Sequence, residues 1–105
     1  MATTFTDANF ETEVLNSDKL AVVDFWATWC PPCLVLGKTI DALAADYDGK
    51  VNIGKLNSDE NPEISVKYGV MNLPCVLFFK NGQLVDKHVG LAARSVYEKK
   101  IQQHM

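Results

Sequence analysis

Two cysteines separated by two residues, Cys30 and Cys33, are the part of this sequence best suited to chemistry. A C-x-x-C pair either helps to bind a metal or undergoes reversible thiol–disulfide exchange. Structural zinc sites take four ligands, commonly from two such pairs or from a cysteine pair and a histidine pair. The remaining cysteine and histidines of this chain are Cys75, His88 and His104, which are far apart in the sequence. We therefore predict a redox pair and no metal site.

The segments around the pair favour a reactive thiolate at Cys30. Residues 20–27 are almost continuously apolar, which is typical of a buried strand. After Cys33, apolar residues recur every three or four positions, which predicts a helix. Cys30 then lies at a helix N-terminus, where free N–H groups and the helix dipole stabilise an anion. We expect Cys30 to attack disulfides and Cys33, one turn later, to resolve the mixed disulfide.

Both residues between the cysteines are prolines, Pro31 and Pro32. Proline has no backbone N–H, and its ring fixes φ. One or two hydrogen-bond donors to the Cys30 anion are therefore absent, while the shape of the turn is preset. These two effects need not change the redox potential in the same direction, so the sequence assigns no value to it.

An acidic residue, Asp24, stands in the middle of the predicted buried strand. Burying a carboxylate is costly unless it is paired or functional, and burial raises its pKa. Asp24 could then take the proton from Cys33 when that thiol attacks. Lys55, in the next predicted strand, is a partner for Asp24. A structural acid bonded to backbone or water fits the sequence equally well.

Strand and helix signals alternate along the chain. The predicted strands cover residues 20–27, 51–56, 76–79 and 83–89. The predicted helices cover residues 6–15, the residues from the cysteine pair to 47, residues 62–68 and residues 93–103. Thr6 or Asp7 is the expected cap of the first helix, and Asn61 that of the third. Asn81-Gly82 predicts a tight hairpin. The order predicts an α/β fold, a central mixed β-sheet flanked by helices on both faces, in a single domain of residues 1–105.

Composition narrows the function classes. The net charge is −3, from 10 basic and 13 acidic residues, and no basic stripe suggests nucleic-acid binding. The longest apolar run, 20–27, is too short to span a membrane and contains Asp24. The N-terminal residues lack the pattern of a secretory signal, and three cysteines do not form a secreted disulfide framework. We expect a cytoplasmic protein that is a monomer.

Several motifs, in one order along the chain, resemble the thioredoxin family. They are VVDFWATWCPPC at 22–33, KLN at 55–57, DENP at 59–62, KYGV at 67–70, LP at 73–74, FFKNG at 78–82 and VG at 89–90. The similarity extends over nearly the whole chain and is far more specific than one C-x-x-C pair. It implies a thioredoxin fold and a protein-disulfide reductase, recharged by a thioredoxin reductase that uses NADPH, with no cofactor beyond the redox-active disulfide.

The resemblance also assigns roles to residues. It makes Cys30 the nucleophile, Cys33 the resolving thiol, Asp24 the buried proton carrier and Lys55 its neighbour. It implies a cis peptide bond between Leu73 and Pro74, beside the active cysteines. The surface that binds an extended segment of a protein disulfide substrate would contain Trp29, Pro31, Pro32, Leu73, Pro74, Gly90 and Leu91.

The chain departs from the family pattern at four places. The family usually has Gly-Pro between its cysteines, a basic residue at the position of Leu34 and a proline at the position of Lys38. The last departure is Cys75, which follows Pro74 where threonine is usual. The fold implied by the resemblance brings this sulfur near the pair. Cys75 is either a small buried residue or a third functional thiol.

Three other functions remain open. The first is a metal or iron–sulfur protein that uses Cys30, Cys33 and Cys75 as ligands. The second is a disulfide oxidase or isomerase, which the Pro31-Pro32 turn would favour if it makes the disulfide more oxidising. The third is a binding subunit that uses the apolar surface and needs no redox change. No histidine lies between the cysteines to stabilise the thiolate, so we favour the reductase.

Overall fold

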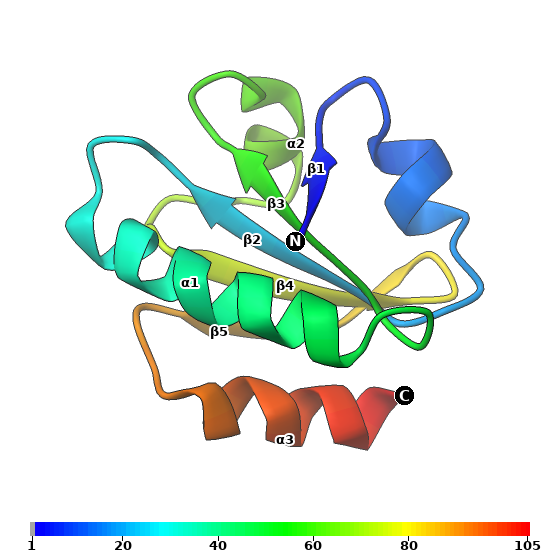
Figure 1. The fold of residues 1–105 in the computed structure, drawn as a ribbon. Helices are drawn as coiled ribbons and strands as arrows, with labels where there is room; N and C mark the ends of the chain where they lie inside the picture. The colour runs from blue at the N-terminus through cyan, green and yellow to red at the C-terminus, as the bar shows by residue number, and fades with distance from the viewer. Residues whose placement is uncertain (1) are drawn as a thin grey trace.

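Five strands form one mixed sheet in the order β1-β3-β2-β4-β5 (Figure 1). The computed structural model describes residues 2–105. The strands are β1 (Thr3–Phe5), β2 (Ala21–Trp26), β3 (Asn52–Asn57), β4 (Cys75–Lys80) and β5 (Gln83–Val89). The first three are parallel to one another, and β4 and β5 continue the sheet as antiparallel strands. β2 therefore lies in the centre, hydrogen-bonded on both sides.

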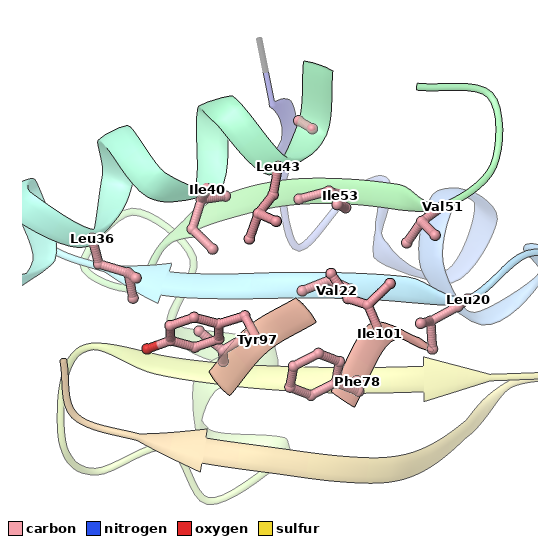
Figure 2. Packing of buried hydrophobic residues seen from close by; sticks show 12 residues of the cluster. Leu20, Val22, Leu36, Ile40, Leu43, Val51, Ile53, Phe78, Tyr97 and Ile101 are labelled. Carbon is pink, nitrogen blue, oxygen red and sulfur yellow. The ribbon is translucent and has the colours of Figure 1, made fainter. Parts of the chain in front are cut away.

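Helices cover both faces of this sheet, which confirms the predicted α/β fold. The helices are α1 (Pro31–Asp46), α2 (Pro62–Lys67), α3 (Arg94–His104) and a short π-helical segment, η1 (Glu11–Leu15). α1 and α3 pack on one face through a cluster that includes Leu36, Ile40 and Tyr97 (Figure 2). η1 and α2 cover the other face, where they pack through a second buried cluster that includes Phe10. None of the helices in the described chain is long and apolar enough to cross a membrane.

The two clusters explain the continuous apolar sequence of β2. Successive side chains of a strand point to opposite faces, so Val22 packs beneath α1 and α3 while Val23 and Phe25 pack beneath η1 and α2. Both faces are covered, so β2 has no polar side apart from Asp24, which is completely buried. The only carboxylate of β2 is thus in the interior, on the face that α1 covers.

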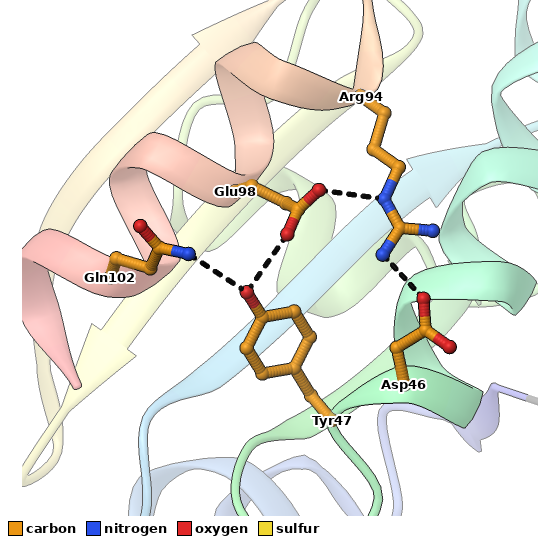
Figure 3. Close-up of polar contacts among 5 residues, drawn as sticks. All are labelled: Asp46, Tyr47, Arg94, Glu98 and Gln102. Carbon is orange, nitrogen blue, oxygen red and sulfur yellow. Dashed lines mark hydrogen bonds and ion pairs between the residues drawn. The ribbon is translucent and has the colours of Figure 1, made fainter.

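A polar cluster fastens α3 to the end of α1 (Figure 3). The Arg94 guanidinium donates to Glu98 and Asp46, and the Tyr47 hydroxyl donates to Glu98 over 3.0 Å. Gln102 in turn donates to the Tyr47 hydroxyl over 3.3 Å. These contacts hold together the two helices on the face of the sheet toward which Asp24 points.

The helix caps differ from those expected. The helix expected at residues 6–15 is shorter, Glu11–Leu15, and of its two expected caps Thr6 accepts a hydrogen bond from the Asn9 amide over 3.1 Å. The Asp7 carboxylate instead accepts hydrogen bonds from the Glu63 and Ile64 amides and caps α2. Asn61 was the expected cap of α2, but its side-chain oxygen accepts from the Asp7 amide, over 2.8 Å. The two residues therefore exchange roles because β1 and its following loop lie beside the start of α2. Strand β1 has no counterpart among the predicted strands.

The remaining boundaries follow the sequence closely. The hairpin between β4 and β5 turns at Asn81 and Gly82, whose φ values are 54° and 77°. Positive φ at both central residues is the geometry that an Asn-Gly turn favours. Helices α2 and α3 begin and end within a residue or two of their predicted limits. The hairpin brings β5 beside β4, at the edge of the sheet.

Candidate functional site

Cys30 and Cys33 form a disulfide where β2 passes into α1. The chain between these two elements is at the left of Figure 1. Cys30 is the N-cap residue of α1, and Cys33 lies in the first turn of that helix, with 5.2 Å between their Cα atoms. Both are buried, and they pack against Ala27, Trp26 and Leu73. The C-x-x-C motif thus has the placement that its sequence context predicted.

The start of α1 provides one amide for the sulfur of Cys30. The Cys33 N–H donates to Cys30 Sγ over 3.3 Å. Pro31 and Pro32 occupy the first two helical positions and have no N–H to offer. Cys33 is therefore the first residue of the helix that can stabilise a negative charge on Cys30. The helix dipole acts in the same direction.

The surface around the disulfide is apolar and exposed. The Trp29 side chain is 67% exposed and is held in place by its Nε1–H, which donates to Asp59 over 2.7 Å. Leu34 and Val35, on the first turn of α1, are both about half exposed. Two apolar side chains therefore stand on the helix beside the sulfur atoms, where a basic residue would add positive charge.

A second loop meets the disulfide from β4. The Leu73–Pro74 peptide bond is cis, and Leu73 packs against the two cysteines. The Pro74 carbonyl accepts a hydrogen bond from the Gly90 amide over 2.8 Å, which brings Gly90 and the half-exposed Leu91 to the same end of the sheet. Of the expected substrate-binding residues, Leu73 thus packs against the disulfide and Gly90 bonds to the neighbouring Pro74. Pro31 and Pro32 are exposed, whereas Pro74 is buried.

Asp24 lies beneath this surface as an isolated buried acid. Its side chain is fully buried, and neither carboxylate oxygen has a hydrogen-bond partner among the described residues. Burial raises the pKa of Asp24 to about 7; the positive charge of Lys55 opposes the rise, and the charge of Asp41 adds to it. A group with such a pKa exchanges its proton near neutral pH, as a general acid or base requires.

A cavity of about 250 Å³ connects Asp24 with the resolving cysteine. Both Asp24 and Cys33 line it, and α1 contributes Leu34, Gly37, Lys38 and Asp41, with Lys55 and Trp26 completing the walls. The cavity is large enough to admit water molecules, and the partly exposed Lys55 and Asp41 side chains give them polar partners next to Asp24. It offers a path for a proton between the thiol and the acid.

Lys55 lies beside Asp24 but is bonded to another residue. The two residues are directly paired between β2 and β3. The Lys55 ammonium, however, donates to the carboxylate of Asp41 on α1, over 3.0 Å. The expected Asp24–Lys55 neighbourhood is present, while the hydrogen bond goes to a residue that the sequence reasoning did not single out. Asp41 is four residues after Gly37, a spacing that places both on one face of α1.

The third cysteine is separated from the pair by the sheet. Cys75 is buried at the start of β4 and packs in the cluster beneath η1 and α2, not beneath α1. Burial raises the pKa of its thiol, against the effect of Lys87. Within residues 2–105 no group of three or more Cys, His, Asp or Glu side chains could hold a metal. The ligand set of Cys30, Cys33 and Cys75 is therefore not assembled.

The sequence comparisons agree on one family. The family model described as Thioredoxin matches residues 1–103. A thioredoxin of Chlorobaculum thiosulfatiphilum is 51% identical over 100 residues, which cover 95% of this chain and 93% of the relative. A thioredoxin of Rickettsia bellii is 50% identical over 91 residues, 87% of each chain. A thioredoxin of Staphylococcus aureus is 45% identical over 100 residues, 95% of this chain and 94% of the relative.

Proposed function

Because this chain belongs to the thioredoxin family and carries a disulfide at the family's active-site position, it is a thiol–disulfide oxidoreductase, and we propose that it works as a reductase of protein disulfides. The redox group of this family is the disulfide itself, not a separate cofactor, and the family's partners are protein substrates and thioredoxin reductase. The observation that carries the proposal is the disulfide at the start of α1, where the Cys33 N–H donates to Cys30 Sγ.

The first step uses Cys30 as the nucleophile of the reduced protein. Its thiolate attacks one sulfur of a substrate disulfide; a new S–S bond forms, the substrate S–S bond breaks, and the second substrate sulfur leaves as a thiolate. The Cys33 amide and the N-terminus of α1 stabilise the attacking anion. The exposed Trp29 and Leu91 side chains and the partly buried Leu73 provide apolar contacts for the substrate chain on either side of its cysteine.

The second step uses Cys33 as the resolving thiol. Asp24 accepts the Cys33 proton across the shared cavity, and the Cys33 thiolate attacks Cys30 Sγ. The bond between Cys30 and the substrate breaks, and the substrate leaves with both of its sulfurs reduced. The protein is left with the Cys30–Cys33 disulfide, which is the state of the structure. Electrons from NADPH, delivered by thioredoxin reductase, then restore the dithiol.

Cysteine variants test these roles. We expect Cys30→Ser to abolish the reduction of insulin disulfides by dithiothreitol, because the attacking thiolate is lost. Cys33→Ser should accumulate a mixed disulfide with the substrate, visible by mass spectrometry as a covalent adduct. Cys75→Ser is the matched control, a buried thiol outside the pair, and should retain the parent rate. A Cys30→Ser protein as active as the parent would refute the proposal.

The reduction potential tests the direction of the reaction. A potential near −270 mV is that of a cytoplasmic reductant, whereas values of about −180 to −120 mV are those of isomerases and oxidases. We propose a value in the first range, a cytoplasmic location, and a monomer that folds as one domain. Equilibration with a glutathione ladder measures the potential, and sedimentation measures the mass.

A further inference from the structure

The hydrogen bond from Lys55 to Asp41 needs an explanation, because a fully buried carboxylate, Asp24, is the residue paired with Lys55 on the adjacent strand. Asp24 and Lys55 are paired residues of adjacent strands. Side chains in such a pair lie on the same face and about 5 Å apart at Cβ, so a lysine can reach the neighbouring carboxylate. In the structure the Asp24 oxygens have no described partner, and the ammonium bonds to Asp41 on α1.

Gly37 makes room for this arrangement. A Cβ atom on Gly37 would lie 3.2 Å from Lys55 Nζ, which is closer than ordinary van der Waals contact. The ammonium therefore rests against the bare helix backbone at Gly37, with Asp41 one helical turn further along. Burial on its own would raise the pKa of Asp41, but the hydrogen bond from Lys55, the hydrogen bond from the Ala2 amide and the charge of Lys55 together lower it, so Asp41 keeps its charge. The carboxylate of Asp41 is a competitor for the cation that would otherwise pair with Asp24.

We propose that Asp41 is a positioning residue of the redox reaction, which holds the Lys55 ammonium against Gly37 and so leaves the Asp24 carboxyl free to exchange protons with Cys33. A lysine bonded directly to Asp24 would stabilise the carboxylate and make it a weaker acceptor for the thiol proton. Asp41 thus acts through Lys55, without touching the reacting atoms. This inference rests on the proposed role of Asp24.

The other charged or titratable groups around Asp24 are few. Besides Lys55 on β3 and Asp41 on α1, the cavity is lined by Lys38 and Cys33, which also belong to α1. Cys75 on β4 lies across the sheet, and Tyr97 lies on α3. Burial raises the pKa of both groups, and the charge of Asp24 raises each of them to a smaller extent. His88 on β5 lies on the same face, through the Asp24–Val76 and Val76–His88 pairs, and its ring packs edge-on against Tyr97. In the oxidised protein Cys33 does not titrate, and the titration is therefore followed at the carboxyl carbon of Asp24 itself.

The test is the titration of Asp24 in the oxidised protein, followed by carboxyl ¹³C NMR. In Asp41→Asn the side chain keeps its shape but loses its charge, so Lys55 is free to approach Asp24. We expect the midpoint of Asp24 to fall by about one pH unit. The acid limb of the pH profile for insulin reduction should move down by the same amount. Asp46→Asn, a charge removed from the same helix at its Arg94 ion pair, should leave both unchanged.

A double-mutant cycle separates the action through Lys55 from the charge of Asp41 itself. In a Lys55→Met background, Asp41→Asn should shift the Asp24 midpoint by less than half as much as in the parent. Equal shifts in the two backgrounds would overturn the proposal, as would an unchanged midpoint in Asp41→Asn. A protein that reduces no disulfide would refute the proposed function, while the NMR titration would still decide whether Asp41 positions Lys55.

Discussion

The amide of Cys33 donates to Cys30 Sγ over 3.3 Å, inside the ring that their disulfide closes. It is the first N–H of α1, because the two preceding helical residues are Pro31 and Pro32. A sulfur at an N-cap usually has the N–H groups of both the second and third helical residues within reach. Here it has only the third, so the thiolate of the reduced protein receives one hydrogen bond fewer.

Replacing the second proline should make the disulfide more oxidising. Pro32→Ala supplies an N–H at the second helical position, where it can donate to the Cys30 thiolate and stabilise the reduced form. One such charged hydrogen bond corresponds to a potential about 30 mV less negative. Pro31→Ala is the control, because an N–H at the first helical position does not point at the N-cap side chain. Glutathione equilibration followed by alkylation and mass spectrometry measures both; equal shifts would contradict this account.

Cys75 should be the slow thiol of the reduced protein. It is 4% exposed and packed under the opposite face of the sheet, and its thiol pKa is raised mainly by burial. The thiolate is the reactive form, so the thiol should react with Ellman's reagent only as the protein unfolds. We expect two fast thiols in native reduced protein and a third in denaturant, and Cys75→Thr should remove only the third. Three fast thiols in native protein would refute this assignment.

The sequence was sufficient where a signal is local. The apolar run around Asp24, the Asn81-Gly82 turn and the proline at the start of α2 each predicted the right element, because strand burial, turn geometry and helix starts depend on neighbouring residues. The predicted cap of α2, Asn61, was wrong because the capping side chain is that of Asp7, 56 residues before Glu63. A side chain that arrives from another part of the fold leaves no mark at the helix itself.

The candidate site shows the same division. The spacing of Cys30 and Cys33 and the buried Asp24 were visible in the sequence, whereas the face on which Cys75 lies depends on the register of β4. Shifting a strand by one residue turns every side chain to the other face. Asp41 was missed for a related reason: its hydrogen bond to Lys55 joins a helix and a strand whose packing the sequence alone does not specify.

Replacing Gly37 and Gly54 by alanine should change the free energy of unfolding in opposite directions. Gly37 lies inside α1, and an added Cβ would meet only the end of the flexible Lys55 side chain. Gly37→Ala should therefore raise the free energy of unfolding by about 0.5–1 kcal/mol, the gain in helix propensity. At Gly54 a Cβ would lie 2.6 Å from the Thr3 carbonyl oxygen and closer still to the Phe5 ring.

Gly54→Ala should accordingly push β1 away from β3, its partner strand, and lower the free energy of unfolding by about 1–3 kcal/mol. Urea denaturation of the two oxidised variants beside the parent measures both changes. A Gly54→Ala protein as stable as the parent would show that β1 adjusts without cost. A destabilised Gly37→Ala protein would show that the Lys55–Asp41 bond contributes more than the helix propensity of the position.

The buried acid should make the protein less stable as pH rises. The pKa of Asp24 is about 7 in the folded chain and near 3.8 when unfolded, so between these values the folded state holds a proton that the unfolded state has lost. The bound proton therefore adds its full contribution to the free energy of unfolding at low pH, and this contribution is lost as the pH rises through the pKa of the folded state. The loss between pH 4 and pH 8 amounts to about 4 kcal/mol.

Asp24→Asn removes this titration while keeping the shape of the side chain. The free energy of unfolding of the parent minus that of the variant should fall by about 4 kcal/mol from pH 4 to pH 8, so the variant gains its advantage in neutral and alkaline solution. Taking the difference cancels the pH dependence that comes from the carboxylates common to both proteins. The control is Asp46→Asn, at the exposed end of α1, for which this difference should show no such trend. A difference that is independent of pH would mean that Asp24 is charged in the folded protein throughout this range, and its role as proton acceptor would fail with it.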